Sequence, residues 1–273
     1  MPDDKATAFA GTLAEFYDRH LVPLLFAPYA AVVAERAKGL GPRRVLETAA
    51  GTGIATEALA RALSSDVAIT ATDLNQAMIE RGKARPDTAR VHWQRADAMK
   101  LPFADGAFDL VVCQFGVMFF PDKRASFGEC FRVLASGGIY LFVLWDAYDR
   151  MPDNPLRIAA QTVGALLKRD PHTLLSPGYF DEPVIRADLA AAGFRDVTVD
   201  HVTRPARAAS AADAALITVQ GSLLRAAIEA ANPARLGEAT KAVETAMATR
   251  FGTGPVDGET KALMVTATKP RAP

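Results

Sequence analysis

The feature that most constrains this chain is a short apolar strand that runs directly into a loop of very small residues. The strand, residues 43–47, ends in the carboxylate of Glu47, and the loop reads Thr-Ala-Ala-Gly-Thr-Gly. An alanine-rich helix, residues 54–63, follows at once. Small residues at a strand–helix turn leave bare backbone at a helix N-terminus, where a ligand can lie against it. The segment therefore predicts an α/β fold with a ligand cleft at this turn.

The segment 43–145 alternates between short apolar runs and helical patterns. The predicted strands cover 43–47, 67–73, 90–94, 108–114 and 138–145, and the predicted helices cover 54–63, 75–85 and 122–134. Continuous apolar runs such as residues 139–144 are typical of buried parallel strands. This alternation predicts right-handed crossovers and a doubly wound, mostly parallel sheet.

The rest of the chain is mostly helical, with two further strands. Two helices are indicated in the first 38 residues, and Pro23 is expected to end the first of them. Later helices are predicted at 156–169, 183–192 and 233–250, and strands at 195–202 and 262–268. Ser210 and Asp213 have the spacing of a capping box at the start of one more helix. The predicted sheet thus has seven strands, with a helical insertion before the last one.

The composition argues against several classes of protein. Lys plus Arg equals Asp plus Glu, 31 against 31, which speaks against a nucleic-acid partner. Half of the residues are hydrophobic, so a packed core is expected. No apolar run approaches the ~18 residues of a membrane span, and the acidic N-terminus lacks a signal-peptide core. The two cysteines lack metal-ligand spacing, so we expect a cytoplasmic protein without a metal site.

Three acidic side chains end three successive predicted strands: Glu47, Asp73 and Asp97. The carboxyl ends of parallel strands meet at one edge of a sheet, where ligands bind. There Glu47 suits a positively charged group, Asp73 can accept hydrogen bonds from ribose hydroxyls, and Asp97 can accept one from an exocyclic amine. A single acid at a strand end is commonly only a solvated cap, but three together favour a binding site. The dinucleotide fingerprint is incomplete, because Thr56 stands where that motif has Gly or Ala.

The motifs around these acids resemble those of class I S-adenosylmethionine-dependent methyltransferases. Glu47-x-Ala49-x-Gly51-x-Gly53 is similar to the first motif, (Asp/Glu)-x-Gly-x-Gly-x-Gly, with Ala49 in place of the first glycine. The second and third motifs of the family are matched by the segments that begin at Asp73 and Asp97.

Two further motifs extend this likeness towards the C-terminus. Residues 132–138 resemble the Arg-Val-Leu-x-x-Gly-Gly turn before strand five, and 192–194 the Ala-Gly-Phe before strand six. The likeness covers about residues 43–202 and is nearest to the ubiquinone and menaquinone C-methyltransferase branch. It implies that S-adenosylmethionine is the cofactor.

The resemblance also implies which residues contact this cofactor. Glu47, with the loop at Ala49, Gly51 and Gly53, would face the methionine portion, and Asp73 would hold the ribose. The other implied contacts are Leu74 and Met78 beside the adenine, Asp97 on its amine, Ala98 N–H on a ring nitrogen, Gln114 and Phe115 beside the sulfonium, and Tyr17 closing over the ligand. Core packing at helical spacing is the alternative explanation for Tyr17 and Met78.

A general base is needed only if the acceptor must lose a proton early. The candidates are His20, Asp146, His172 and Tyr179, and none of them belongs to a motif. Trp145, at the end of the fifth predicted strand, points either to the cleft mouth or to the core.

These observations predict one methyltransferase domain over residues 1–273. Residues 1–42 would form an N-terminal helical lid, 43–202 and 259–270 the cofactor-binding core, and 203–258 a helical insertion that serves as lid or acceptor pocket. The expected reaction is methyl transfer to a small apolar or aromatic molecule by in-line displacement. An NAD-dependent oxidoreductase and a non-catalytic S-adenosylmethionine-binding protein are the alternatives. The oligomeric state, a homodimer included, stays open.

Overall fold

The computed structural model describes residues 15–175 and 178–271, which form two compact units. The sheet unit comprises Tyr29–Trp145, Tyr179–Val202 and the chain from Ala262 onward. The helical unit comprises the chain up to Pro28, Asp146–Gly178 and Thr203–Lys261.

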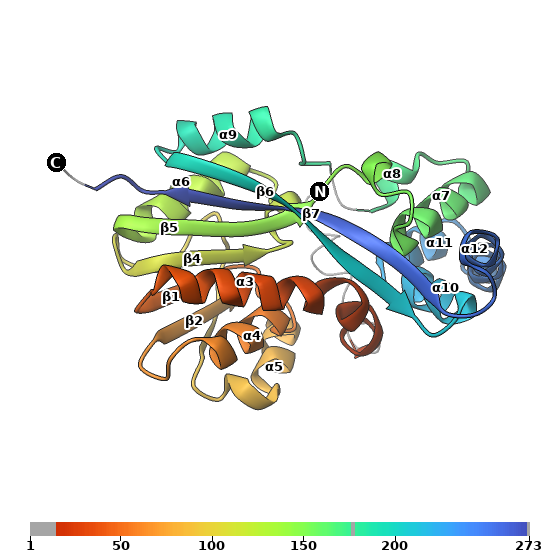
Figure 1. Ribbon diagram of the computed structural model, residues 1–273, viewed down its shortest axis with the longest axis horizontal. Helices are drawn as coiled ribbons and strands as arrows, with labels where there is room; N and C mark the ends of the chain where they lie inside the picture. Colours follow the sequence, from red (N-terminus) through yellow and green to blue (C-terminus); the bar gives the residue numbers. More distant parts are fainter. Residues whose placement is uncertain (1–14, 176–177, 272–273) are drawn as a thin grey trace. The chain divides into compact units, whose positions relative to one another are not determined.

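A seven-stranded sheet runs through the sheet unit in the order β3-β2-β1-β4-β5-β7-β6 (Figure 1). Its strands are β1 (Arg44–Glu47), β2 (Ala68–Asp73), β3 (His92–Arg95), β4 (Phe108–Gln114), β5 (Leu134–Trp145), β6 (Arg195–Ala208) and β7 (Val256–Thr268). Strands β1 to β5 pair in parallel, whereas β7 is antiparallel to β5. The predicted doubly wound, mostly parallel sheet is therefore confirmed.

The strand order reverses at β1, which pairs with β2 on one side and with β4 on the other. In open α/β sheets this switch point opens a crevice at the carboxyl ends of the strands. The apolar runs that predicted β1, β4 and β5 are buried almost completely, because helices cover both faces of a parallel sheet.

The helices of the sheet unit precede or connect its strands along the chain. They are α3 (Ala27–Leu40), α4 (Ile54–Ala62), α5 (Gln76–Lys83), α6 (Lys123–Val133) and α9 (Glu182–Ala191), with short 3-10 turns η2 (Pro86–Thr88) and η3 (Val117–Phe119). Asn75 and Asp122 cap α5 and α6 by accepting backbone N–H bonds. These caps fix where the two helices begin: α5 directly after β2, and α6 after the η3 turn that follows β4.

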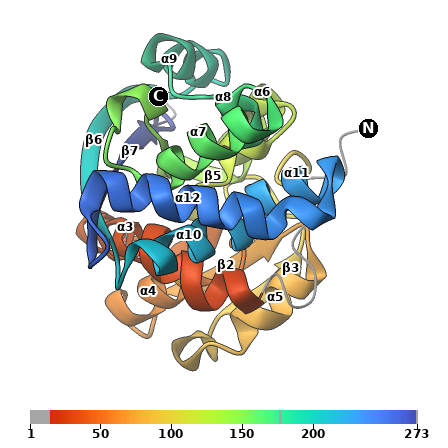
Figure 2. The same ribbon diagram turned by 90° about the vertical axis from the view of Figure 1, so that its right-hand side faces the viewer.

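The helical unit is built around α7, α10 and α12, which pack against one another (Figure 2). Its helices are η1 (Tyr17–Phe26), η4 (Tyr148–Arg150), α7 (Pro155–Leu167), α8 (Pro171–Leu174), α10 (Ala211–Gln220), α11 (Leu223–Ala231), η5 (Pro233–Arg235) and α12 (Leu236–Phe251). Within the described residues no single helix is long and apolar enough to cross a membrane. Helices α10 and α11 meet that test only as a pair bent by 72°.

Two local expectations are wrong. Pro23 lies inside η1 instead of ending a helix, because the wide turns of this π-helix relieve the clash of the ring with the carbonyl four residues earlier. Strands β6 and β7 are longer than predicted, reaching Ala208 and beginning at Val256. The extension of β6 contains Pro205 and two arginines, so it has no apolar run, yet the two strands continue side by side there.

Candidate functional site

The loop after β1 is shaped by three residues with left-handed backbone. Ala49, Gly51 and Gly53 have φ of 52°, 57° and 82°. A Cβ built on Gly51 would meet nothing within 4 Å, so the backbone is open on that side. A Cβ on Gly53 would lie 2.9 Å from the Trp93 ring, which excludes any larger residue there. The loop thus forms a bare cradle at the N-terminus of α4, as its sequence predicted.

Asp73 connects this loop to the end of β2. Its Oδ2 accepts the Gly51 N–H at 2.8 Å, and its Oδ1 accepts the Asn75 N–H at 2.8 Å. Burial raises the pKa of this carboxyl, while the backbone N–H bonds oppose the rise. Each carboxylate oxygen can accept more than one hydrogen bond. Asp73 therefore holds the cradle in place and can still accept bonds from two neighbouring hydroxyls.

Glu47 is buried at the end of β1, beneath the cradle. The Thr56 hydroxyl, in the first turn of α4, donates to Glu47 Oε2 at 2.5 Å. Burial raises the pKa of Glu47 to about 8, and the negative charge of Asp73 adds to the rise. The side chain is consequently protonated at neutral pH until a positive charge comes near it. Sequence reasoning used Thr56 only to reject a dinucleotide motif and missed this partnership.

The third acid, Asp97, lies in a turn directly after β3. Its Oδ1 accepts the Met99 N–H at 2.9 Å, and the Ala96 N–H before it donates to the Asp73 carbonyl at 3.1 Å. Ala98 is buried in the same turn. Strands β1, β2 and β3 are neighbours and parallel, so their carboxyl ends bring all three acids to one edge of the sheet.

Residues beside the second acid differ in exposure. Leu74 is 45% exposed, whereas Met78 is 8% exposed in α5. The exposed Leu74 side chain is available to a flat ligand group, and Met78 is in contact mostly with the core. Adenine contact at Leu74 and Met78 stays a prediction.

An aromatic cluster closes the end of β4. Phe115, the next residue after Gln114 at the end of β4, has a φ of 56° and stacks on Trp145 with ring centroids 3.9 Å apart. Tyr29 packs edge-on against both rings, at 5.3 and 5.6 Å. Trp145 thus belongs to a buried cluster, which settles its direction in favour of the core. Left-handed backbone at a residue as large as Phe115 is strained, and such strain concentrates at functional sites.

The methyl group of Ala49 is accommodated by Gly116. A Cβ built on Gly116 would lie 2.6 Å from the Ala49 Cβ, so the two positions are complementary. The methyl therefore points towards the loop after β4, and the open side of the cradle at Gly51 stays free. This contact explains how the first motif can carry alanine where the family has glycine.

Two of the four candidate bases are already engaged. Asp146 is buried and accepts the Arg150 guanidinium at 3.0 Å. The Tyr179 hydroxyl donates to Asp188 at 3.0 Å, and burial together with Asp188 raises its pKa well above the usual range. The Tyr179 hydroxyl therefore keeps its own proton, and a role for Asp146 as the base stays a prediction.

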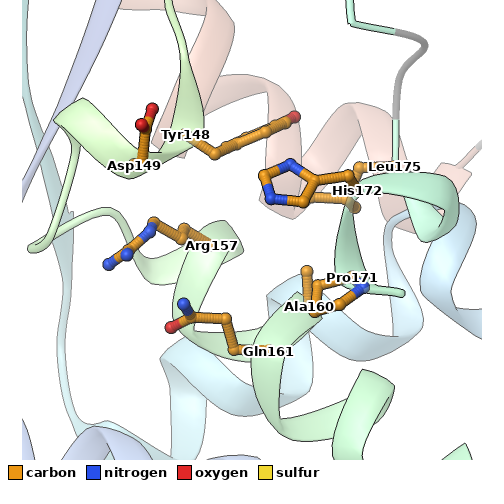
Figure 3. A pocket seen from close by; sticks show the side chains of 8 residues that line it. All are labelled: Tyr148, Asp149, Arg157, Ala160, Gln161, Pro171, His172 and Leu175. Atoms are coloured by element: carbon orange, nitrogen blue, oxygen red, sulfur yellow. The ribbon is translucent and has the colours of Figure 1, made fainter. Parts of the chain in front are cut away.

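The other two candidate bases, His20 and His172, lie in the helical unit. The His20 ring packs 4.5 Å from the Phe16 ring, and Tyr17 lies beside Phe26. His172 lines a pocket of about 50 Å³ within this unit (Figure 3). Its ring is 6.5 Å from the Tyr148 ring, and side chains of α7 form another wall. Apart from His172, no residue of this pocket was predicted from the sequence.

Comparison with known proteins identifies the sheet core. Residues 45–138 match the family described as "Methyltransferase domain". This segment is a class I methyltransferase domain. The family recognised from the motifs is confirmed, and with it S-adenosylmethionine as the cofactor; the oxidoreductase alternative is not favoured.

Several characterised proteins are similar to this chain over part of its length. A demethylmenaquinone methyltransferase of Thermus thermophilus is 41% identical over 98 residues, 36% of this chain and 44% of that protein. A malonyl-[acyl-carrier protein] O-methyltransferase of Geobacter sulfurreducens is 35% identical over 167 residues, 60% of each. The chain spans about half the length of the relatives that it matches.

Similarity of fold extends further than similarity of sequence. The YcgJ protein of Bacillus subtilis has a TM-score of 0.58 and 19% identity, and the match covers 88% of this chain and 99% of that protein. At this identity the comparison concerns the fold alone, and it supports the seven-stranded arrangement described above.

Proposed function

We propose that this protein transfers the methyl group of S-adenosylmethionine to a small apolar or aromatic molecule. The observation that carries the proposal is the cradle at Gly51, held by the Asp73 carboxylate and lying above the buried Glu47. Open backbone at a helix N-terminus, flanked by two carboxyl groups, suits a ligand that carries a cation at one end and a ribose beside it.

The residues fit this cofactor by their donor and acceptor chemistry. Glu47 would lie near the ammonium of the methionine portion, and Asp73 would accept the ribose hydroxyls. Asp97 would accept the adenine amine through Oδ2, since its Oδ1 already accepts the Met99 N–H. Ala98 N–H would donate to an adenine ring nitrogen, with Leu74 and Met78 along the ring faces.

The bound cofactor supplies an activated methyl group on a sulfonium. The chain's own contribution is then to orient the acceptor and to exclude water. Gln114 and the strained Phe115 would border the reacting region, and the aromatic cluster behind Phe115 keeps that wall rigid and apolar. We further propose that residues 1–42 and 203–258, with Tyr17, act as lid and acceptor pocket.

Calorimetric titration with S-adenosylhomocysteine tests the cofactor assignment, with NADH as the control ligand. Micromolar binding of S-adenosylhomocysteine and no binding of NADH is the expected result. The reverse pattern would overturn the proposal and restore the oxidoreductase alternative. Methyl transfer is then assayed with radiolabelled S-adenosylmethionine and a panel of phenols, quinols and amines. Cofactor binding without transfer to any acceptor would favour a non-catalytic binding protein.

A further inference from the structure

Glu129 and Arg132 on α6 form an ion pair that binds the connection between β3 and β4, residues 96–107. Arg132 Nε and Nη2 donate to the two carboxylate oxygens of Glu129, at 2.8 and 2.9 Å. The pair is therefore bidentate, the strongest arrangement of this kind. The hydrogen bonds to Arg132 hold the pKa of Glu129 below its usual range, so the carboxylate is ionised at neutral pH.

The two side chains bind mainly backbone groups of the connection. Glu129 Oε2 accepts the Leu101 N–H at 2.6 Å, while Arg132 Nη2 donates to the Leu101 carbonyl at 2.9 Å. Arg132 Nη1 donates to the Phe103 carbonyl at 2.6 Å and to Asp105 at 2.8 Å.

The backbone of Arg132 also takes part, because its carbonyl accepts the Gly106 N–H at 3.0 Å. The two side chains thus bind the backbone N–H and C=O of Leu101, the Phe103 carbonyl and Asp105, and the Arg132 backbone adds Gly106.

This connection begins with the turn that carries Asp97. The turn is held on its other side by the Ala96 N–H on the Asp73 carbonyl at 3.1 Å and by Arg95 on the Leu74 carbonyl at 2.9 Å. Leu101 follows Asp97 by four residues, so fixing Leu101 limits the positions open to the Asp97 carboxylate. The carboxylate needs a fixed position because a hydrogen bond weakens steeply when its angle is poor.

We propose that Glu129 and Arg132 are positioning residues for adenine recognition, and that they act by fixing the turn of Asp97. The inference rests on the proposed function, in which Asp97 accepts the adenine amine. Neither side chain needs to touch the ligand. Their contribution is selectivity for the exocyclic amine of the base, rather than general affinity for the cofactor.

The test compares two ligands by calorimetry: S-adenosylhomocysteine and its analogue with purine in place of adenine, which lacks only the exocyclic amine. Arg132→Gln is expected to lower the affinity for S-adenosylhomocysteine about tenfold. This corresponds to the low end of the free energy lost with a hydrogen bond to a charged group. The affinity for the purine analogue should fall less than twofold. Arg44→Gln is the matched control, because it removes an arginine–carboxylate pair with Asp109 at the opposite ends of the strands. It should change neither affinity.

Equal weakening of both ligands by Arg132→Gln would overturn the proposal, because it would mean a general loss of structure. An Arg132→Gln protein that binds both ligands as tightly as wild type would overturn it too, because the preference for the adenine ligand would be unchanged. Glu129→Gln serves if Arg132→Gln does not fold; its expected effect is the same selective loss, about threefold. Wild-type protein that binds neither ligand would instead refute the proposed function.

Hydrogen exchange of the unliganded protein tests whether Glu129 and Arg132 fix the connection. The amides of Leu101 and Gly106, both bonded to the pair, are expected to exchange at least tenfold faster in Arg132→Gln than in wild type. Amides of β1 should keep their rates. Unchanged exchange at Leu101 and Gly106 would show that the pair does not fix the connection, whatever the ligands do.

Discussion

Replacing Glu47 by Gln is expected to stabilise the protein at neutral pH. The pKa of this carboxyl is about 8 in the folded protein, against 4.5 for an unperturbed glutamic acid. At pH 7 the side chain is therefore ionised in the unfolded chain and protonated in the native state, so folding must take up a proton. The cost grows by about 1.4 kcal/mol for each pH unit between the two pKa values.

The sign and size of the effect follow directly. The folded-state pKa is raised, so the stability associated with the protonated carboxyl is fully present below pH 4.5 and is lost as the pH rises towards 8. By pH 7 the wild-type protein has lost about 3 kcal/mol of unfolding free energy. Gln stays neutral at every pH, and its carbonyl can still accept the hydrogen bond from Thr56, so the variant keeps this energy.

Urea unfolding of wild type and Glu47→Gln, without cofactor, measures the difference. The unfolding free energies should agree within about 1 kcal/mol at pH 5, and the variant should be more stable by about 3 kcal/mol at pH 7. Glu57→Gln is the control of opposite sign. Glu57 is also buried, but it is paired with Arg61 at 2.7 Å and Arg85 at 2.9 Å, so its loss should destabilise the protein by about 2 kcal/mol.

A Glu47→Gln protein that is no more stable than wild type at pH 7 would refute the reasoning. So would a stability difference that stays constant between pH 5 and pH 7, because it would have no connection with a proton. The expected stabilisation is accompanied by weaker binding of S-adenosylhomocysteine, since Gln cannot supply a charge opposite the ammonium. Residues at binding sites commonly trade stability for function in this way.

Two further substitutions test the cradle. Asp73→Asn should weaken S-adenosylhomocysteine binding by about 1.5–3 kcal/mol in calorimetry, the range for hydrogen bonds to a charged group. Asp109→Asn is the control, because it also alters a carboxylate that accepts backbone N–H bonds, but at the start of β4. It should leave the binding unchanged. Equal affinity in a folded Asp73→Asn protein would remove Asp73 from the site. Gly116→Ala should lower the unfolding free energy measured in urea by about 1–3 kcal/mol, because its Cβ would lie 2.6 Å from the Ala49 Cβ. Gly128→Ala, in α6 with open space around it, should be neutral or stabilising, and a destabilised Gly128→Ala would show that the packing argument is wrong.

Local signals in the sequence predicted several elements of both units well. The strand of residues 108–114 has the predicted bounds, and α4 begins at Ile54 as its small-residue loop indicated. The helix cap predicted at Ser210 is present, with its Oγ accepting the Asp213 N–H at 3.1 Å. Such features are predictable because periodicity, caps and turns depend on residues within a few positions of one another.

The errors occur where local chemistry and tertiary context disagree. Pro23 is a helix breaker by its own geometry, but the surrounding segment adopts wide π-helical turns around it. The extension of β6 contains Pro205 and charged residues, and only pairing with a distant strand makes it a strand. In both cases the local preference of the residues exists, but the conformation of the surrounding segment or pairing with a distant strand overrides it.

The sequence by itself determined the fold class, the family and the three acids that end neighbouring strands, since motif spacing and apolar periodicity are written along the chain. Only the tertiary structure decided how those acids behave. The bond from Gly51 to Asp73 joins residues 22 positions apart, and that from Leu101 to Glu129 joins residues 28 apart. Burial of Glu47, and hence its raised pKa, depends on everything packed around it. Solvent exclusion and hydrogen-bond geometry are properties of assembled elements, so no local pattern contains them.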